Sequence, residues 1–158
     1  MHPDLYSGLS WAYPGHQWSP NLEALEDLRE KAEGVGLCVG IENMPRGRFL
    51  LGSSKDFTNF FTEMTMDDAA MTLDVSHANT HEVCEFLTRL GSRIIHMHIH
   101  DNYGSHDEHN LIGRGTTDWV AVTRFLKTRS FPGFVIVEST SETIKSYRKA
   151  CEMLGLDR

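Results

Sequence analysis

Four short apolar runs in this chain each end near a carboxylate or a histidine, and amphipathic stretches separate them. The runs are Leu37–Glu42, Ala70–Val75, Ile94–Ile99 and Phe134–Glu138. Apolar runs that alternate with helical patterns predict repeated strand–helix units, and such units build a parallel sheet. We therefore expect an α/β fold with a parallel sheet.

Helical periodicity places five amphipathic helices around these runs. They are expected at Ser19–Gly34, after Ser53 and Ser54, and at Thr80–Leu90, Asp118–Thr128 and Glu142–Leu154. Ser19 is a suitable N-cap ahead of Pro20, and Gly91 ends the third helix. A polar loop, 101–115, follows the third run, with a short strand near 110–112. The predicted core positions of the helices are Leu22, Leu25, Leu28, Ala32, Phe57, Phe60, Phe61, Met64, Val83, Phe86, Leu87, Leu90, Trp119, Val122, Phe125, Leu126, Ile144, Tyr147, Cys151 and Leu154.

The length favours a single domain over residues 1–158, and the composition favours a location inside the cell. The chain has 158 residues and a net charge of −7, and it lacks the basic clusters of a dedicated nucleic-acid binder. No apolar run approaches the roughly 20 residues of a membrane span, and the first residues do not form a signal peptide. Cys38, Cys84 and Cys151 are odd in number and far apart, so we expect buried thiols in a reducing compartment, the cytoplasm.

The residues at the ends of the four runs are the central functional signal. In parallel α/β folds the ligand site lies beyond the carboxyl ends of the strands, so Glu42, Asp74, His98 and Glu138 should converge there. Carboxylates gathered in one place repel each other, and a divalent cation removes that repulsion. Asp, Glu and His suit zinc, manganese or iron, and cobalt is a further possibility.

Three more residues are candidate metal ligands. His77 follows Asp74 by three positions, and Asp107 and His109 lie in the polar loop. The alternative for His77 is that it only caps the following helix. The alternative for Asp107 and His109 is that they lie in a solvated loop. We expect His96 to point to the opposite face of its strand from His98, as a histidine packed in the core or between layers.

Four residues are candidate contacts to a substrate. Asn43 could orient Glu42 or bind substrate, and His100 could line the site without binding metal. Asp101 is a further candidate contact. Arg114, between two glycines, is a candidate partner for a substrate phosphate, and the alternative is that Gly113 and Gly115 simply form a turn.

An ordered set of short motifs resembles a known family, the xylose isomerase-like TIM barrels. This family includes endonuclease IV (AP endonuclease family 2) and many sugar phosphate isomerases and epimerases. The resemblance covers essentially the whole chain. The motifs are Ile41-Glu42-Asn43-Met44, Leu73-Asp74-Val75-Ser76-His77-Ala78-Asn79, His98-Ile99-His100-Asp101-Asn102, Asp107-Glu108-His109, Gly113-Arg114-Gly115 and Val137-Glu138.

The two branches of the family imply different sites. The epimerase branch implies one divalent metal on the four strand-end residues, with Glu42 and Glu138 as the acid/base pair. The endonuclease branch implies three zinc ions, with His77, Asp107 and His109 as further ligands and His2 as another candidate. The acidic charge favours the first branch, a sugar or sugar phosphate isomerase or epimerase, over cleavage of abasic DNA.

The length implies only part of a barrel. A complete (β/α)8 barrel needs about 250 residues, and the resemblance implies that this chain supplies about strands four to eight. An open barrel exposes sheet edges, and we expect a homo-oligomer to cover them. A third possibility is that the half-barrel binds metal without catalysing a reaction.

Overall fold

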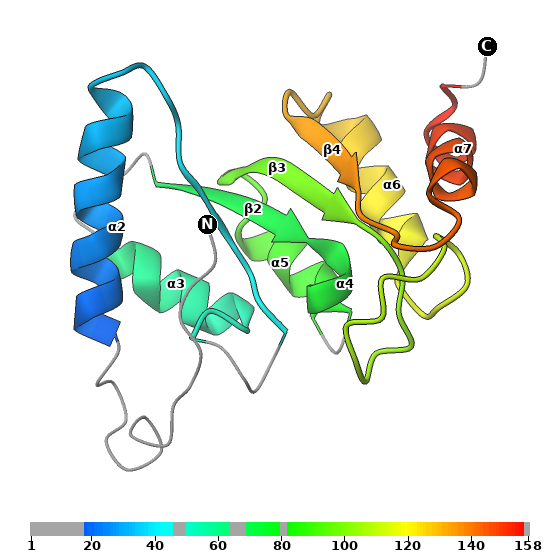
Figure 1. Ribbon diagram of the computed structural model, residues 1–158, viewed down its shortest axis with the longest axis horizontal. Coiled ribbons are helices and arrows are strands. Elements are labelled where there is room, and N and C mark those ends of the chain that lie inside the picture. Colours follow the sequence, from blue (N-terminus) through cyan, green and yellow to red (C-terminus); the bar gives the residue numbers. More distant parts are fainter. Residues whose placement is uncertain (1–17, 46–49, 64–68, 80–81, 157–158) are drawn as a thin grey trace.

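The computed structural model describes residues 18–45, 50–63, 69–79 and 82–156 and confirms a parallel α/β fold (Figure 1). Strands alternate with helices along the chain, as the apolar runs predict. The elements in order are α2 (Trp18–Glu33), β1 (Gly40–Glu42), α3 (Ser54–Glu63), β2 (Ala70–Asp74), α4 (Val75–Ala78), α5 (Val83–Arg89), β3 (Ile94–Ile99), α6 (Trp119–Thr128), β4 (Phe134–Val137) and α7 (Thr143–Leu154).

The four described strands lie side by side in chain order, β1-β2-β3-β4, and every pair is parallel. The arrowheads of β2, β3 and β4 therefore point toward the same edge in Figure 1. A register irregularity between Met71 and Thr72 shifts β2 relative to β3, so that Thr72 lies opposite His96 and Asp74 opposite His98. The carboxyl ends of all four strands meet at one rim.

The two faces of the sheet carry different kinds of side chain. Side chains alternate between the faces of a strand. One face carries apolar residues that are almost completely buried under the helices: Ile41, Met71, Leu73, Met97 and Ile99. The opposite face carries the strand-end ligands and, on β4, Phe134 and Ile136, whose exposed fractions are 74% and 43%. This second face corresponds to the interior of a closed barrel.

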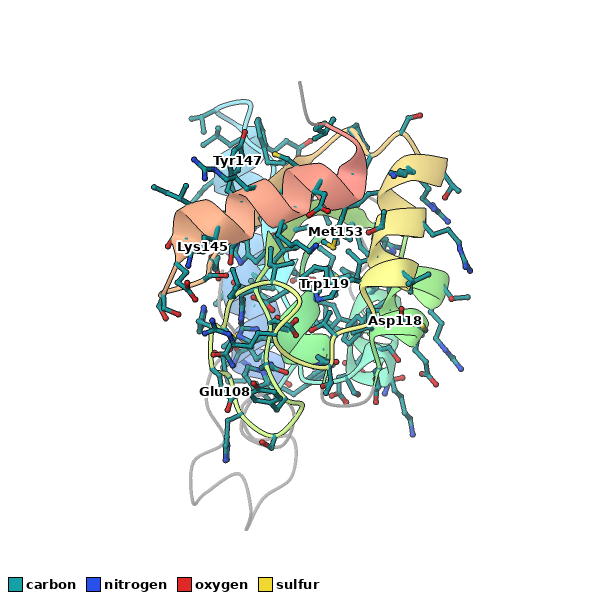
Figure 2. All side chains as sticks on the ribbon, turned by 90° about the vertical axis from the view of Figure 1, so that its right-hand side faces the viewer. Glu108, Asp118, Trp119, Lys145, Tyr147 and Met153 are labelled. Atoms are coloured by element: carbon teal, nitrogen blue, oxygen red, sulfur yellow. The ribbon has the colours of Figure 1, made fainter. Side chains whose placement is uncertain are left out.

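The helices bury the apolar stripes that their periodicity predicts. Phe57 and Phe60 of α3 and Phe86 of α5 are fully buried, and the rings of Phe57 and Phe86 make an edge contact. Trp119 and Met153 fill the space between α6 and α7, as Figure 2 shows. The predicted core residue Met64 lies outside the described residues, as do the first two residues of the helix expected from Thr80.

Several local expectations were wrong. Leu28, Ile144 and Tyr147 are exposed, because the buried stripes of α2 and α7 are narrower than predicted. Cys38 and Cys84 are exposed and Cys151 is half-buried. Cys38 precedes β1, and Cys84 lies beside the inward-facing Val83 but on the solvent side of α5. The strand expected near 110–112 is a single bridge between Asp101 and Asn110.

No helix in the described part of the chain is long and apolar enough to cross a bilayer.

The short helix α4, which the sequence analysis did not anticipate, begins directly after β2. Asp74 caps it, accepting hydrogen bonds from the backbone N–H groups of Ser76 and His77. This turn therefore fixes the carboxylate at the end of β2.

The core between α3 and α5 yields a stability prediction. Phe57→Ala removes a fully buried ring and should lower the free energy of unfolding by about 3–5 kcal/mol. Val120→Ala, on the exposed side of α6, is the control and should change it by no more than about 0.5 kcal/mol. Urea denaturation followed by circular dichroism measures both. Equal midpoints for the two variants would contradict the described packing.

Candidate metal centre

The four strand-end residues gather at the rim of the sheet. Glu42, Asp74, His98 and Glu138 each offer one ligand atom, and these atoms all lie within 4.8 Å of one another. Nδ1 of His98 is 2.9 Å from Oε1 of Glu42 and 3.3 Å from Oε1 of Glu138. His98 therefore lies between the two glutamates.

The donor set fits a divalent cation. Ligand atoms that bind a cation at about 2.0–2.2 Å lie roughly 3–3.5 Å apart, close to the separations around His98. Three carboxylates and one imidazole form a hard, oxygen-rich set that suits zinc, manganese or iron. Glu42 and Asp74 are buried, so their charges need a compensating partner. The residues present therefore fit the metal that the sequence pattern implies.

A buried amide holds the second carboxylate in place. The Asn43 side chain donates from Nδ2 to the backbone carbonyl of Asp74 (2.9 Å) and accepts from its N–H (2.7 Å). Oδ1 of Asp74 caps α4, and Oδ2 is 3.1 Å from Nε2 of His100. Of the two roles considered for Asn43, positioning is the one that this geometry supports, although it acts on Asp74 and not on Glu42.

Imidazoles and carboxylates shift each other's pKa at this rim. Burial alone would lower the pKa of His98, but the hydrogen bond to Glu42 and the surrounding carboxylate charge raise it above its usual value. Burial alone would raise the pKa of Asp74, but the hydrogen bond with His100 and the nearby imidazole charges lower it. The imidazoles and carboxylates at this rim therefore stabilise each other's charged forms.

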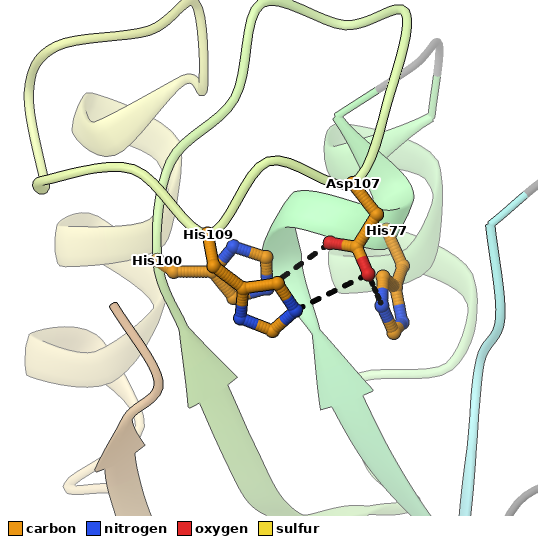
Figure 3. Close-up of side chains that lie close together, drawn as sticks. All are labelled: His77, His100, Asp107 and His109. Atoms are coloured by element: carbon orange, nitrogen blue, oxygen red, sulfur yellow. Dashed lines mark hydrogen bonds and ion pairs between the residues drawn. The ribbon is translucent and has the colours of Figure 1, made fainter. Parts of the chain in front are cut away.

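A second group of side chains lies beside the first. Ligand atoms of His77, His100, Asp107 and His109 also lie within 4.8 Å of one another. Figure 3 shows the Asp107 carboxylate reaching down from its loop between the imidazoles. Burial alone would lower the pKa of His77, but the hydrogen bond to Asp107 and nearby carboxylates raise it to about 9. The same contact lowers the pKa of Asp107 to about 2, against the effect of burial.

Sequence reasoning missed the membership of His100 in this group. His100 was expected to line the site as a substrate contact, but its ring is fully buried and stacks on His109 with a centroid separation of 3.8 Å. The sequence signal that could have identified His100 is its position two residues after His98, at the end of the same strand. A residue just past a strand end can turn toward the loop that follows.

Two other expected substrate contacts, Asp101 and Arg114, bond to groups within the protein, and their contact with a substrate stays a prediction. Asp101 is fully buried and accepts hydrogen bonds from the N–H of Gly113, from the hydroxyl of Thr117 and from the indole of Trp119. Arg114 pairs with Glu142 at 2.6 Å. The glycines beside Arg114 form a turn, since Gly113 has a positive φ and a Cβ on position 115 would overlap the Asn102 carbonyl.

The expectation for His96 was wrong. Side chains two residues apart in a strand point to the same face, and the rings of His96 and His98 are 5.2 Å apart. His96 therefore lies on the inner face of the sheet, one register step below the candidate metal centre. His2 lies outside the described residues.

The comparisons with known proteins agree with this geometry. The xylose isomerase-like TIM barrel family matches residues 1–155. The uncharacterized protein MJ1311 of Methanocaldococcus jannaschii is 32% identical over 98% of this chain and 54% of its own length. Fructoselysine 3-epimerase of Escherichia coli O157:H7 is 24% identical over 84% of this chain and 52% of its own. This chain thus spans about half the length of these curated relatives.

Solved structures give the same fold. A D-tagatose 3-epimerase-like protein superposes with a TM-score of 0.88 and 29% identity, covering 99% of this chain and 61% of that one. The IolI protein with a zinc atom superposes with a TM-score of 0.73 and 18% identity, covering 98% of this chain and 62% of that one. The expectation of a partial TIM barrel is confirmed.

The Asn43 amide provides a test of the candidate metal centre. Asn43→Ala removes both hydrogen bonds to the Asp74 backbone and should weaken zinc binding roughly 10–100-fold, the usual cost of losing a group that orients a ligand. Asn59→Ala, on the exposed side of α3, is the matched control and should leave the affinity unchanged. Isothermal titration of metal-free protein measures both. Equal affinities would remove Asn43 from the support of the site.

Proposed function

The chain belongs to the xylose isomerase-like TIM barrel family, and we propose that it carries the metal-binding part of a divalent-metal-dependent epimerase or isomerase for a sugar or sugar phosphate. The observation that carries this proposal is the placement of His98 between Glu42 and Glu138, with Asp74 beside them. Relatives named as fructoselysine 3-epimerase and D-tagatose 3-epimerase-like protein support the substrate class.

Two glutamates are available to move a proton. Glu42 ends β1 and Glu138 follows β4, so they approach His98 from opposite ends of the described sheet. One carboxylate removes the proton beside a substrate carbonyl, and the other returns a proton on the opposite side, which inverts the carbon. Glu42 is buried, whereas Glu138 retains about a third of its exposure and meets solvent.

Glu42, Asp74, His98 and Glu138 would hold the cation. When bound, the cation would act as a Lewis acid that polarises the substrate carbonyl oxygen and stabilises the negative charge of the enediolate. Zinc and manganese are the proposed ions, and the zinc atom named with the IolI structure supports the first. Asn43 and His100 keep Asp74 oriented.

The net charge and the relatives weigh against the DNA alternative. The chain carries −7, whereas an enzyme that binds abasic DNA neutralises phosphates with Lys and Arg. Arg114, the candidate phosphate partner, is already paired with Glu142. The activity test therefore also includes an abasic-site oligonucleotide, whose cleavage would support the DNA alternative.

Glu138→Gln tests the proton-transfer role. The substitution keeps the size of the side chain but removes the carboxylate, so it should abolish exchange of the substrate proton with deuterated water and should weaken metal binding. Glu108→Gln, in the exposed part of the 100–118 loop, is the matched control. A panel of ketohexoses and ketose phosphates, assayed by NMR with added Mn²⁺ or Zn²⁺, gives the readout.

Full proton exchange by Glu138→Gln would remove Glu138 from the mechanism. Cleavage of abasic DNA without sugar epimerisation would replace the proposed activity with the alternative. Metal binding without either activity would mean that this half-barrel binds metal but does not catalyse either reaction.

We also propose that a second copy of this chain covers the open sheet. The described sheet has β1 and β4 at its edges, and a closed barrel of this type has eight strands. A second copy, related to the first by a rotation about the barrel axis, would place its β1 beside β4 of the first copy in a parallel arrangement. Phe134 and Ile136, exposed on β4, would then face an interior.

Phe134→Asp tests this assembly. It places a charge at the centre of the proposed interface and should convert a dimer into a monomer in light scattering of the 158-residue chain. Val120→Asp, equally exposed but on the outer helix α6, should leave the dimer intact. A wild-type chain that is a stable monomer at tens of micromolar would contradict the proposal.

A further inference from the structure

We propose that His96 is a positioning residue, whose ring holds the imidazole of His98 with Nδ1 turned toward the two glutamates of the candidate metal centre. The inference rests on the proposed function, because the direction of Nδ1 matters only if this atom binds a cation. His96 is not one of the candidate ligands. It acts on the site through His98.

The ring of His98 needs a support that decides which of its edges faces the glutamates. The torsion about the Cβ–Cγ bond of a histidine is broad and roughly two-fold, so the strand alone does not set it. A half-turn about this bond would put the carbon Cδ2 in the place of Nδ1. Nδ1 lies 2.9 Å from Oε1 of Glu42 and 3.3 Å from Oε1 of Glu138, and the half-turn would remove the ligand atom from both.

The contact with Glu42 cannot be the whole support. It uses the same Nδ1 atom that would bind the cation, so this hydrogen bond is given up when a cation binds. Metal-binding histidines commonly donate their other N–H to a carbonyl or a carboxylate, which then holds the ring. Within residues 18–45, 50–63, 69–79 and 82–156, Nε2 of His98 makes no hydrogen bond of this kind. Packing is the support that is left.

His96 supplies this packing. The centroids of the His96 and His98 rings are 5.2 Å apart, and the two planes meet at 88°, edge to face. Ring pairs at this separation and angle attract each other and favour one relative orientation. The contact involves no hydrogen bond between the rings. It therefore persists while the hydrogen bond to Glu42 is exchanged for a cation.

The sheet fixes His96 in its turn. His96 lies directly opposite Phe134 in the pairing of β3 with β4, and their ring centroids are 6.1 Å apart. On its other side it lies opposite Thr72, which is buried. The pairing of β2 with β3 skips Ile95, and irregularities of this kind re-aim side chains next to active sites. Two neighbouring strands thus place the ring that contacts His98.

The depth of His96 indicates positioning and not contact with a substrate. It precedes His98 by two residues, roughly 6.5 Å along the strand, on the side away from the rim. A substrate that binds at the carboxyl ends of the strands would meet the candidate ligands before it reached His96. The contribution of His96 is therefore the direction of the His98 ring.

Mn²⁺ binding tests the proposal, because Mn²⁺ suits the oxygen-rich set at the strand ends. His96→Ala keeps all four candidate ligands and should weaken Mn²⁺ binding to metal-free protein roughly 3–10-fold, the range expected for the loss of one ring contact. His96→Phe restores a ring without nitrogen atoms and should bind as tightly as the wild type. His106→Ala, at an exposed histidine of the polar loop, is the matched control and should also be unchanged. Isothermal titration measures all four proteins.

Two results of the titration would overturn the proposal. Equal affinities of the wild type and His96→Ala would show that the site does not need this ring. Equally weak binding by His96→Ala and His96→Phe would show that the imidazole nitrogens act and the ring contact does not.

NMR of the His98 ring tests the orientation without metal or activity. In metal-free protein labelled at histidine, His98 should give one sharp set of ring signals in the wild type and in His96→Phe. In His96→Ala the set should double or broaden by exchange, and a single sharp set there would overturn the proposal. A wild-type chain that binds no Mn²⁺ would contradict the proposed metal centre, and the ring signals would still decide the role of His96.

Discussion

Repulsion among carboxylates at one rim of the sheet is the interaction on which the structure depends. Parallel topology brings Glu42, Asp74 and Glu138 together, although long stretches of sequence separate them. Buried charges of one sign are costly unless protons or a cation compensate them. His98 lies between the two glutamates, and their charge raises its pKa. The fold therefore gathers a set of ligand atoms whose electrostatic balance, in the function we propose, a divalent cation completes.

The side chains around this rim divide into ligands and a supporting frame. Asn43 and Asp101 are fully buried, and their hydrogen bonds connect strand ends to neighbouring backbone. Ser76 donates to the His100 carbonyl and joins α4 to the end of β3. This frame fixes the positions of the candidate ligands, so the proposed cation would bind a preorganised site.

The sequence was sufficient to predict the strands and their convergence, because apolar runs and parallel connections follow general rules. The sequence could not reveal which polar residues use their hydrogen bonds to connect parts of the protein. Asn43 and Asp101 were predicted as substrate contacts from a linear motif, and only the folded structure shows that both are buried and hydrogen-bonded within the protein. The contribution of His100 depends on how the chain turns after β3, and the exposure of Cys84 depends on which side of α5 faces the core. Such details arise from tertiary packing.

The most direct test of the metal centre is anomalous X-ray diffraction at the zinc absorption edge from crystals grown with Zn²⁺. The account predicts an anomalous peak within bonding distance of Glu42, Asp74, His98 and Glu138. The absence of a peak among these four residues, in crystals where zinc is bound elsewhere on the chain, would contradict it.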